Sequence, residues 1–282
     1  MSDALELWEA ILLGLIEGLT EFLPVSSTGH LTVTEKLLGY DIDAPDVTAF
    51  TAIIQMGAIL ATLVYFREDI TRFTVAFARG VVRPEARAGA EWRFAVALLL
   101  GSLPIAIVGL AFKDTIETTL RNLWFVGGAL ILWSGVMLYA DRTARLVRGE
   151  GDVRRRDTLI IGTVQCLALI PGVSRSGATL SAGLLLGLDR VTATRLAFFL
   201  AIPALTAATL LQIATEYDSI ADGVGWSATI VALLTSFVVA YGVVSWLLRF
   251  VAGHTFTVFI AYRLVAGTIV LALVASGAVS AT

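Results

Sequence analysis

The chain has 282 residues, of which 57% are hydrophobic and only 15% are charged, and its formal net charge is −3. Soluble domains carry about 25% charged residues, so this composition argues against a soluble protein and predicts an integral membrane protein. The small negative charge does not favour a nucleic-acid partner, and a single cysteine, Cys166, excludes an intrachain disulfide.

The first element is an apolar region over about 5–38, interrupted at 17–30 by the sequence EGLTEFLPVSSTGH. Glu17 and Glu21 are four residues apart, so a helix that runs toward Pro24 places both carboxylates on one face. The hydroxyls and the glycine after Pro24 are typical of a turn. This turn and the histidine after it provide four polar candidates for a functional site: Ser26, Ser27, Thr28 and His30.

Six apolar segments are long enough to cross a bilayer, which needs about 20 residues. They cover residues 48–66, 94–112, 123–140, 196–215, 226–248 and 256–276. The connections 67–93 and 141–157 each carry six arginines, whereas 216–225 has no lysine or arginine. The positive-inside rule therefore places the two basic connections in the cytoplasm and 216–225 outside. Parity then puts 113–122 and both termini outside.

A second interrupted apolar region covers about 158–190 and contains PGVSRSGAT at 171–179. Neither half of either interrupted region can cross a bilayer, and irregular backbone at membrane depth needs protein or water partners. We therefore expect two re-entrant helix hairpins, although kinked full spans would give a similar pattern. At an offset of 148 residues, VSSTG at 25–29 matches VSRSG at 173–177.

This match divides the chain into two halves with one hairpin and three spans each. Because three is odd, the second half begins on the opposite side of the membrane, as in inverted-topology repeats. We expect one membrane domain over 1–282, with the first half at about 1–140 and the second at about 158–282. The cytoplasmic connection 141–157 joins them.

Four ionisable groups fall within the interrupted regions: Glu17, Glu21, His30 and Arg175. Each costs about 2.5–3.5 kcal/mol at the bilayer centre when ionised, so they must pair or line a polar cavity. One alternative is a purely structural buried network. The other is chemistry, in which a serine at 26 or 27 attacks phosphorus and His30 takes its proton. The two carboxylates would hold a divalent cation, or one of them would orient His30.

The second turn has the composition of a phosphate-binding site. Arg175 offers a planar fork of donors, and the apolar run at 180–188 predicts a helix whose N-terminal amides favour anions. Gln165 and Leu169 stand where the repeat would place Glu17 and Glu21, so the first half is expected to react and the second to bind. The small and hydroxyl residues around Arg175 are Gly172, Ser174, Ser176, Gly177 and Thr179.

EGLTEFLPVSSTGH and PGVSRSGAT closely resemble the paired signatures of the undecaprenyl-diphosphate phosphatase family, the BacA/UppP type of bacitracin resistance protein. The resemblance implies that a C55 polyprenyl diphosphate is hydrolysed to the monophosphate, which recycles the carrier lipid for cell-wall polymers. It implies a divalent ion such as Mg²⁺ or Ca²⁺, and an active site that opens to the outer face of the plasma membrane. The implied roles are an acidic motif at Glu17 and Glu21, a nucleophile at Ser27, its acid/base partner at His30, and diphosphate binding by Arg175 with Ser174, Ser176 and Thr179.

We therefore expect an all-α membrane phosphatase whose partners are the polyprenyl diphosphate and membrane lipids, with no nucleic acid. Water activated at Glu21 or His30 is a variant of the Ser27 mechanism. The rival interpretation is a polyprenyl-phosphate transporter or flippase, because inverted repeats with broken helices are typical of transporters. A structural membrane subunit would leave the buried charges unexplained. Gly127 and Gly128 would allow close helix contacts and a homodimer.

Overall fold

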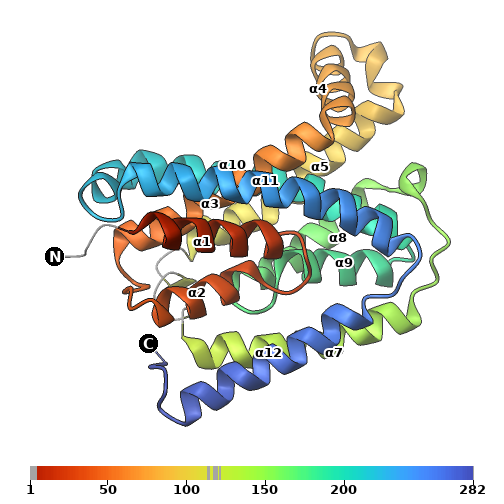
Figure 1. Cartoon of the computed structure of the whole chain (residues 1–282). Coiled ribbons are helices and arrows are strands. Elements are labelled where there is room, and N and C mark those ends of the chain that lie inside the picture. Colours follow the sequence, from red (N-terminus) through yellow and green to blue (C-terminus); the bar gives the residue numbers. More distant parts are fainter. Residues whose placement is uncertain (1–4, 113–114, 117–119, 121, 282) are drawn as a thin grey trace.

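A computed structural model describes residues 5–112, 115–116, 120 and 122–281 (Figure 1). This part of the chain is helical and contains no β-strand. Its candidate membrane spans are α3 (Pro45–Tyr65), α5 (Ala90–Ala111), α7 (Leu123–Thr143), α10 (Arg190–Asp222), α11 (Trp226–Val251) and α12 (Thr257–Ala275). Each coincides with one predicted span, so the prediction of an all-α polytopic membrane protein is confirmed.

Four shorter helices form the two interrupted regions: α1 (Leu7–Thr20), α2 (Ser27–Leu37), α8 (Arg155–Gln165) and α9 (Arg175–Leu185). The longest has 14 residues, which at a rise of about 1.5 Å per residue covers about 21 Å. The hydrocarbon core of a bilayer is about 30 Å thick, so none of these helices crosses it alone. Their re-entrant arrangement in a membrane stays a prediction.

The helices of the two interrupted regions correspond at the predicted offset of 148. Helices α1 and α8 begin at that offset, and α2 and α9 both begin and end at it. Each pair is followed by a glycine in the left-handed region, Gly39 at φ 89° and Gly187 at φ 84°. These correspondences support the two repeat halves, and the opposite orientation of the halves in a membrane stays a prediction.

Close helix crossings hold the two hairpins in place. Helix α1 packs on α11, and α8 packs on α5. A side chain at Gly14 would collide with the backbone of Ala232, and one at Gly162 would collide with the carbonyl of Gly101. Gly14 and Gly162 are again 148 residues apart. Small residues at these crossings let the backbones touch, which is how helices pack tightly in lipid.

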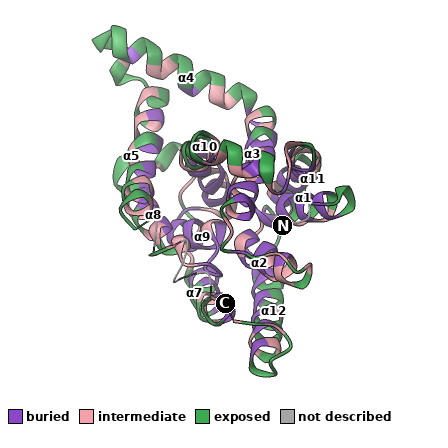
Figure 2. Cartoon of the chain, turned by 90° about the vertical axis from the view of Figure 1, so that its left-hand side faces the viewer, coloured by how far each residue is buried: buried purple, intermediate pink, exposed green. Residues whose placement is uncertain are grey.

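The outer faces of the spans are apolar, as expected of a surface covered by lipid. Figure 2 shows buried residues between the helices and exposed residues on their outward faces. The exposed side chains on the spans include Ile107, Leu132, Val238 and Val265, each of which is more than half exposed. Large exposed apolar surface of this kind marks a membrane protein rather than a soluble one.

The segments between the spans contain more helix than the sequence pattern indicated. The basic connection 67–93 forms an amphipathic helix, α4 (Arg67–Val82), and the short 3₁₀ helix η1 (Pro84–Ala88). Helix α10 continues through most of 216–225, with a non-helical residue at Glu216. The predicted connection 113–122 lies largely outside the described residues.

Ion pairs join the connection 141–157 to its neighbours, at the end of the bundle where α3 ends and α10 begins. Arg195 on α10 contacts Asp69 of α4 at 2.7 Å and Glu150 of η2 (Glu150–Asp152) at 2.7 Å. Arg190 contacts Asp141 at the end of α7 at 2.7 Å. The arginine-rich end of the bundle is therefore tied together by charge pairs.

The helix contact expected of Gly127 is made within the chain. A side chain there would meet Leu271 and Gly267 of α12, whereas Gly128 faces open space. The homodimer stays a prediction.

Candidate active site

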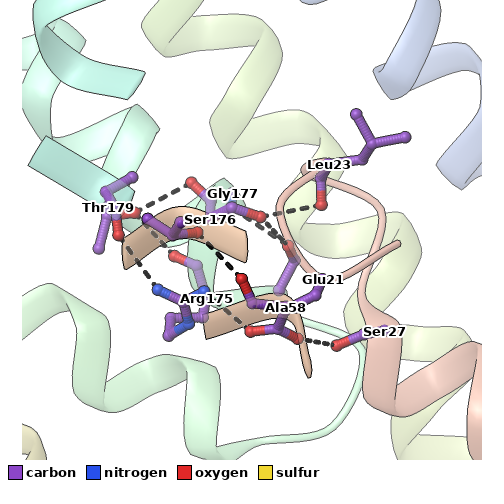
Figure 3. Close-up of polar contacts among 11 residues, drawn as sticks. Glu21, Leu23, Ser27, Ala58, Arg175, Ser176, Gly177 and Thr179 are labelled. Atoms are coloured by element: carbon purple, nitrogen blue, oxygen red, sulfur yellow. Dashed lines mark hydrogen bonds and ion pairs between the residues drawn. The ribbon is translucent and has the colours of Figure 1, made fainter. Parts of the chain in front are cut away.

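The two predicted turns meet in the middle of the bundle, although they are about 150 residues apart in the chain. The Gly172 amide donates to Ser26 Oγ at 3.2 Å. Ser176 Oγ donates to the Leu23 carbonyl at 2.9 Å, as Figure 3 shows. Each bond between the turns thus joins a serine hydroxyl of one turn to a backbone group of the other. This fixes the relative position of the side chains they carry.

Both turns begin their helices with a strained serine. Ser26 at φ 75° accepts from the Gly29 amide and caps α2, and Ser174 at φ 74° accepts from the Gly177 amide and caps α9. Serine is a favoured N-cap, but a non-glycine residue at positive φ is uncommon and costs on the order of 1–3 kcal/mol. Such strain gathers at functional sites, and it occurs here at matching positions of both halves.

Glu21 is the centre of the contact between the turns. Its Oε2 accepts from Ser27 Oγ at 2.5 Å, and its Oε1 lies 2.8 Å from Nη2 of Arg175. Figure 3 shows the carboxylate between Ser27 and Arg175. Arg175 also donates through Nη1 to the Ala197 carbonyl at 3.1 Å. Its Nε is buried and has no hydrogen-bond partner among the described residues.

The His30 ring hydrogen-bonds to groups other than Ser27. Its Nδ1 lies 2.7 Å from the Ser26 carbonyl and its Nε2 lies 2.6 Å from the hydroxyl of Tyr262. A carbonyl only accepts, so Nδ1 carries a proton, and in the neutral ring Nε2 accepts from Tyr262. The predicted pair of Ser27 and His30 is therefore not brought together, and the group that receives the Ser27 hydrogen bond is Glu21.

Glu17 lies on α1 four residues before Glu21 and is completely buried. Among the described residues, no hydrogen-bond donor reaches either of its carboxylate oxygens. Buried oxygens without donors suit a cation, and Mg²⁺ is often held by one or two carboxylates with phosphate and water as further ligands. The predicted pair, Glu17 and Glu21, is thus chemically suited to a divalent ion, although no cluster of three such protein ligands occurs in the described part of the chain.

The remaining predicted binding residues divide into two groups. Ser26, Thr28 and Ser174 line a cavity at the junction of the turns. The others bond within the protein. Gly172 has φ 99° and its carbonyl accepts from Arg263, the Gly177 amide is held by Ser174, and Thr179 Oγ1 donates to carbonyls of its own helix. Their contribution is to shape the second turn.

The cavity has a volume of about 240 Å³. Glu21, Ser27 and Arg175 face it from the turns, and Thr51 and Gln212 face it from α3 and α10. Ile105 and Leu205 add an apolar side. Ligand pockets for drug-sized molecules have about 300–1,000 Å³, so this cavity suits a compact anionic group better than a long chain. A hydroxyl, a carboxylate and a guanidinium therefore converge on it.

Sequence reasoning missed three residues at the site. Arg263 on α12 hydrogen-bonds to both turns. Tyr262 on the same helix contacts His30, and Glu35 on α2 is buried and accepts from Thr51 at 2.7 Å. A signal was present for Arg263, because it is an ionisable residue inside the predicted span 256–276, where such residues are functional by default. Tyr262 had no comparable signal.

Comparison with known proteins gives consistent matches over the whole chain. The family model described as bacitracin resistance protein BacA matches residues 10–269. Undecaprenyl-diphosphatase 3 of Frankia casuarinae is 66% identical over 274 residues, which cover 97% of this chain and 99% of that protein. Undecaprenyl-diphosphatase of Cutibacterium acnes is 52% identical, with 96% and 98% covered. Undecaprenyl-diphosphatase 1 of Streptomyces avermitilis is 50% identical, with the same coverage.

Proposed function

This chain belongs to the BacA family of bacitracin resistance proteins, and from that we propose that it is a membrane phosphatase which hydrolyses undecaprenyl diphosphate to the monophosphate and inorganic phosphate. The observation that supports this most is the contact of Ser27 and Arg175 with one carboxylate, that of Glu21, at a cavity of headgroup size. A transporter needs no such nucleophile and base. The transport alternative is therefore not favoured.

In this mechanism Ser27 is the nucleophile and Glu21 is its base. The Ser27 hydroxyl passes its proton to Oε2 of Glu21 as its oxygen attacks the terminal phosphorus. The bond from that phosphorus to the bridging oxygen breaks, and the lipid monophosphate leaves with the bridging oxygen and its electron pair. Water then attacks the phosphoserine and the bond from phosphorus to the Ser27 oxygen breaks. The protons of the water leave with the inorganic phosphate, while the Ser27 oxygen takes back the proton held by Glu21, which restores the hydroxyl and the carboxylate.

Arg175 serves both partners of the reaction. Its Nη2 holds the Glu21 carboxylate in place at 2.8 Å. The Arg175 side chain also lines the cavity in which the phosphate oxygens would carry negative charge. A guanidinium fixed in a water-poor site stabilises that charge without reorganising, and this is often the largest contribution to catalysis. The first turns of α2 and α9 add backbone amides that favour an anion.

His30 has a supporting part in this assignment. It holds the carbonyl of the strained Ser26 while Tyr262 holds the ring from the other side. Since its ring nitrogens are engaged there, the base is Glu21 in the resting enzyme.

Glu17 and Glu21 would hold a divalent cation such as Mg²⁺ or Ca²⁺, together with diphosphate oxygens and water. When bound, such an ion would neutralise phosphate charge and polarise the P–O bond. The two carboxylate oxygens of Glu17, which are buried and have no hydrogen-bond partner among the described residues, support this part of the proposal.

The cavity opens to the outer face of the plasma membrane, and both termini lie on that side. Its lining includes Thr48 near the start of α3, Ile116 in the connection 113–122, and Gln212 in the second half of α10. All three lie toward the end of the bundle that the arginine distribution assigns to the outside. Labelling of intact cells with a membrane-impermeant thiol reagent, in a Cys166→Ser background, tests this orientation. Asp218→Cys lies on the side assigned to the outside and should be labelled, whereas Arg154→Cys lies on the side assigned to the inside and should not.

Inorganic phosphate release by the purified protein in detergent tests the activity. Wild-type protein with Mg²⁺ is expected to release phosphate from a polyprenyl diphosphate, and Ser27→Ala and Arg175→Ala are expected to lose at least about 10²-fold in kcat. Acid quenching with substrate labelled in the terminal phosphate should leave label on Ser27. Absence of release from folded wild-type protein would overturn the phosphatase, whereas release by Ser27→Ala would replace the serine mechanism by direct attack of water.

A further inference from the structure

A completely buried arginine on the last helix bonds to both turns of the active site. Arg263 lies on α12, far from either turn in the chain, and its side chain has no exposed surface. Its Nη1 donates to the Pro24 carbonyl at 3.2 Å. Its Nη2 donates to the carbonyls of Gly172 at 2.9 Å and Val173 at 3.1 Å. One guanidinium thus spans the junction between the turns.

The rest of the guanidinium is anchored to α7. Nε donates to Ser134 Oγ at 3.2 Å, and Nη2 also lies 3.4 Å from the Leu130 carbonyl. All of its hydrogen-bond partners in the described part of the chain are carbonyls and one hydroxyl. An arginine buried in a membrane protein is costly unless its donors are satisfied. Here the donors are satisfied in part by backbone carbonyls of the two active-site turns. The buried charge of Arg263 therefore helps to order those turns.

The carbonyls that it binds stand next to the reacting groups. Pro24 lies midway between Glu21 and Ser27, and Val173 is two residues before Arg175. A change in the position of Arg263 therefore moves the nucleophile and its base relative to the guanidinium that faces the phosphate. Among the described residues, Arg263 is the side chain from outside the turns that hydrogen-bonds to both.

We infer that Arg263 is a positioning residue, which sets the distance between the Ser27–Glu21 pair and Arg175 by holding the carbonyls of both turns. This inference rests on the phosphatase function proposed above. Arginine suits the task because its planar fork presents five donors in fixed directions, whereas a lysine ammonium presents three donors from one atom. The charge alone would not hold two turns in register.

The kinetic test is Arg263→Lys, which keeps the charge and removes the fork. A misplacement of about 1 Å in an active site costs about 10²-fold in rate. We therefore expect kcat for phosphate release to fall by about 10- to 100-fold. KM should stay within about threefold of the wild-type value, because Arg175 and the cavity still bind the substrate in its ground state. An unchanged kcat, or a loss confined to KM, would overturn the inference.

Arg190→Lys is the matched control. Arg190 is a partly buried arginine that likewise joins two helices, through Asp141. It is the first residue of α10, whereas the cavity is lined by Leu205 and Gln212 farther along that helix. It is expected to keep the wild-type kcat. An equal loss of kcat in both variants would mean that Arg263 contributes only general stability, and would overturn the positioning role.

Ser134→Ala decides the case if Arg263→Lys is not recovered as folded protein. It removes one acceptor of Arg263 and leaves the guanidinium in place. The loss of one hydrogen bond predicts about a two- to tenfold fall in kcat at constant KM. A kcat equal to that of the wild type would contradict the inference.

Hydrogen exchange gives a readout that does not depend on activity. In Arg263→Lys, or in Ser134→Ala if that variant has to be used, peptides over 21–30 and 170–179 should both exchange faster, by about tenfold for the lysine variant. In Arg190→Lys neither should change. Unchanged exchange in both peptides would overturn the inference even if the wild type proved inactive, and an inactive wild type with coupled exchange would refute only the phosphatase.

Discussion

Replacement of Glu21 by glutamine is the sharpest test of the proposed chemistry. Glu21→Gln keeps the size of the side chain but removes the charge that accepts the Ser27 proton. With the amide oxygen facing Arg175 at the observed 2.8 Å, the amide NH₂ group faces Ser27. An NH₂ group donates and does not accept, so the serine loses its base.

The expected loss follows from this single change. A positioned general base contributes about 10²- to 10⁴-fold in rate, which corresponds to about 2.7–5.4 kcal/mol of transition-state stabilisation. Arg175 keeps the Ala197 carbonyl as a partner, so the variant should fold. We therefore expect kcat to fall by about 10²- to 10⁴-fold, with a much smaller change in KM.

The assay is phosphate release by purified protein in detergent, at saturating Mg²⁺ and over a range of substrate concentrations. Glu9→Gln is the matched control, because Glu9 is a buried carboxylate on the same helix that accepts from Tyr40 rather than from the site. The control should keep the wild-type kcat. A Glu21→Gln enzyme within about tenfold of the wild-type kcat would refute the assignment of the base.

Three further outcomes are expected. Gly162→Ala should lower the free energy of unfolding by about 1–3 kcal/mol, because the added side chain would collide with the backbone of α5. Thermal unfolding measures this loss, and Gly128→Ala is the control, because Gly128 faces open space. Tyr262→Phe should lower thermal stability by about 0.5–1.5 kcal/mol through loss of its hydrogen bond to His30, and an unchanged unfolding midpoint would argue that this bond contributes nothing. EDTA should abolish phosphate release, and Glu17→Gln should raise the Mg²⁺ concentration needed for half-maximal rate; an unchanged Mg²⁺ titration would remove Glu17 from the ion site.

The spans could be predicted because the thickness of the bilayer dictates the length of an apolar run. Their ends could not, since a helix does not stop where the hydrocarbon stops. Helix α10 continues to Asp222 although 216–222 is polar, and α3 begins at Pro45, which is well placed in the first turn of a helix. The same limit hid α4, whose charged sequence forms a helix beyond the end of α3.

The site was predictable where a buried charge requires a partner. Glu21 and Arg175 were expected to pair or to line a polar cavity, and they do both. The orientation of His30 was not predictable, because its partners are the carbonyl of its own helix turn and a tyrosine 232 residues away. The contacts of Arg263 were hidden for a similar reason, since its acceptors are mainly backbone carbonyls, which every residue has.

The small volume of the cavity has a consequence for how the enzyme meets its substrate. About 240 Å³ admits a headgroup, so a C55 tail remains among the acyl chains, against the apolar faces of the helices. Encounter is then lateral diffusion in two dimensions, and the relevant concentration is a mole fraction in the lipid phase. In detergent, added micelles should slow phosphate release at fixed bulk substrate. Polyprenyl diphosphates with tails of different length should compete equally for the active site when they are present in the same bilayer.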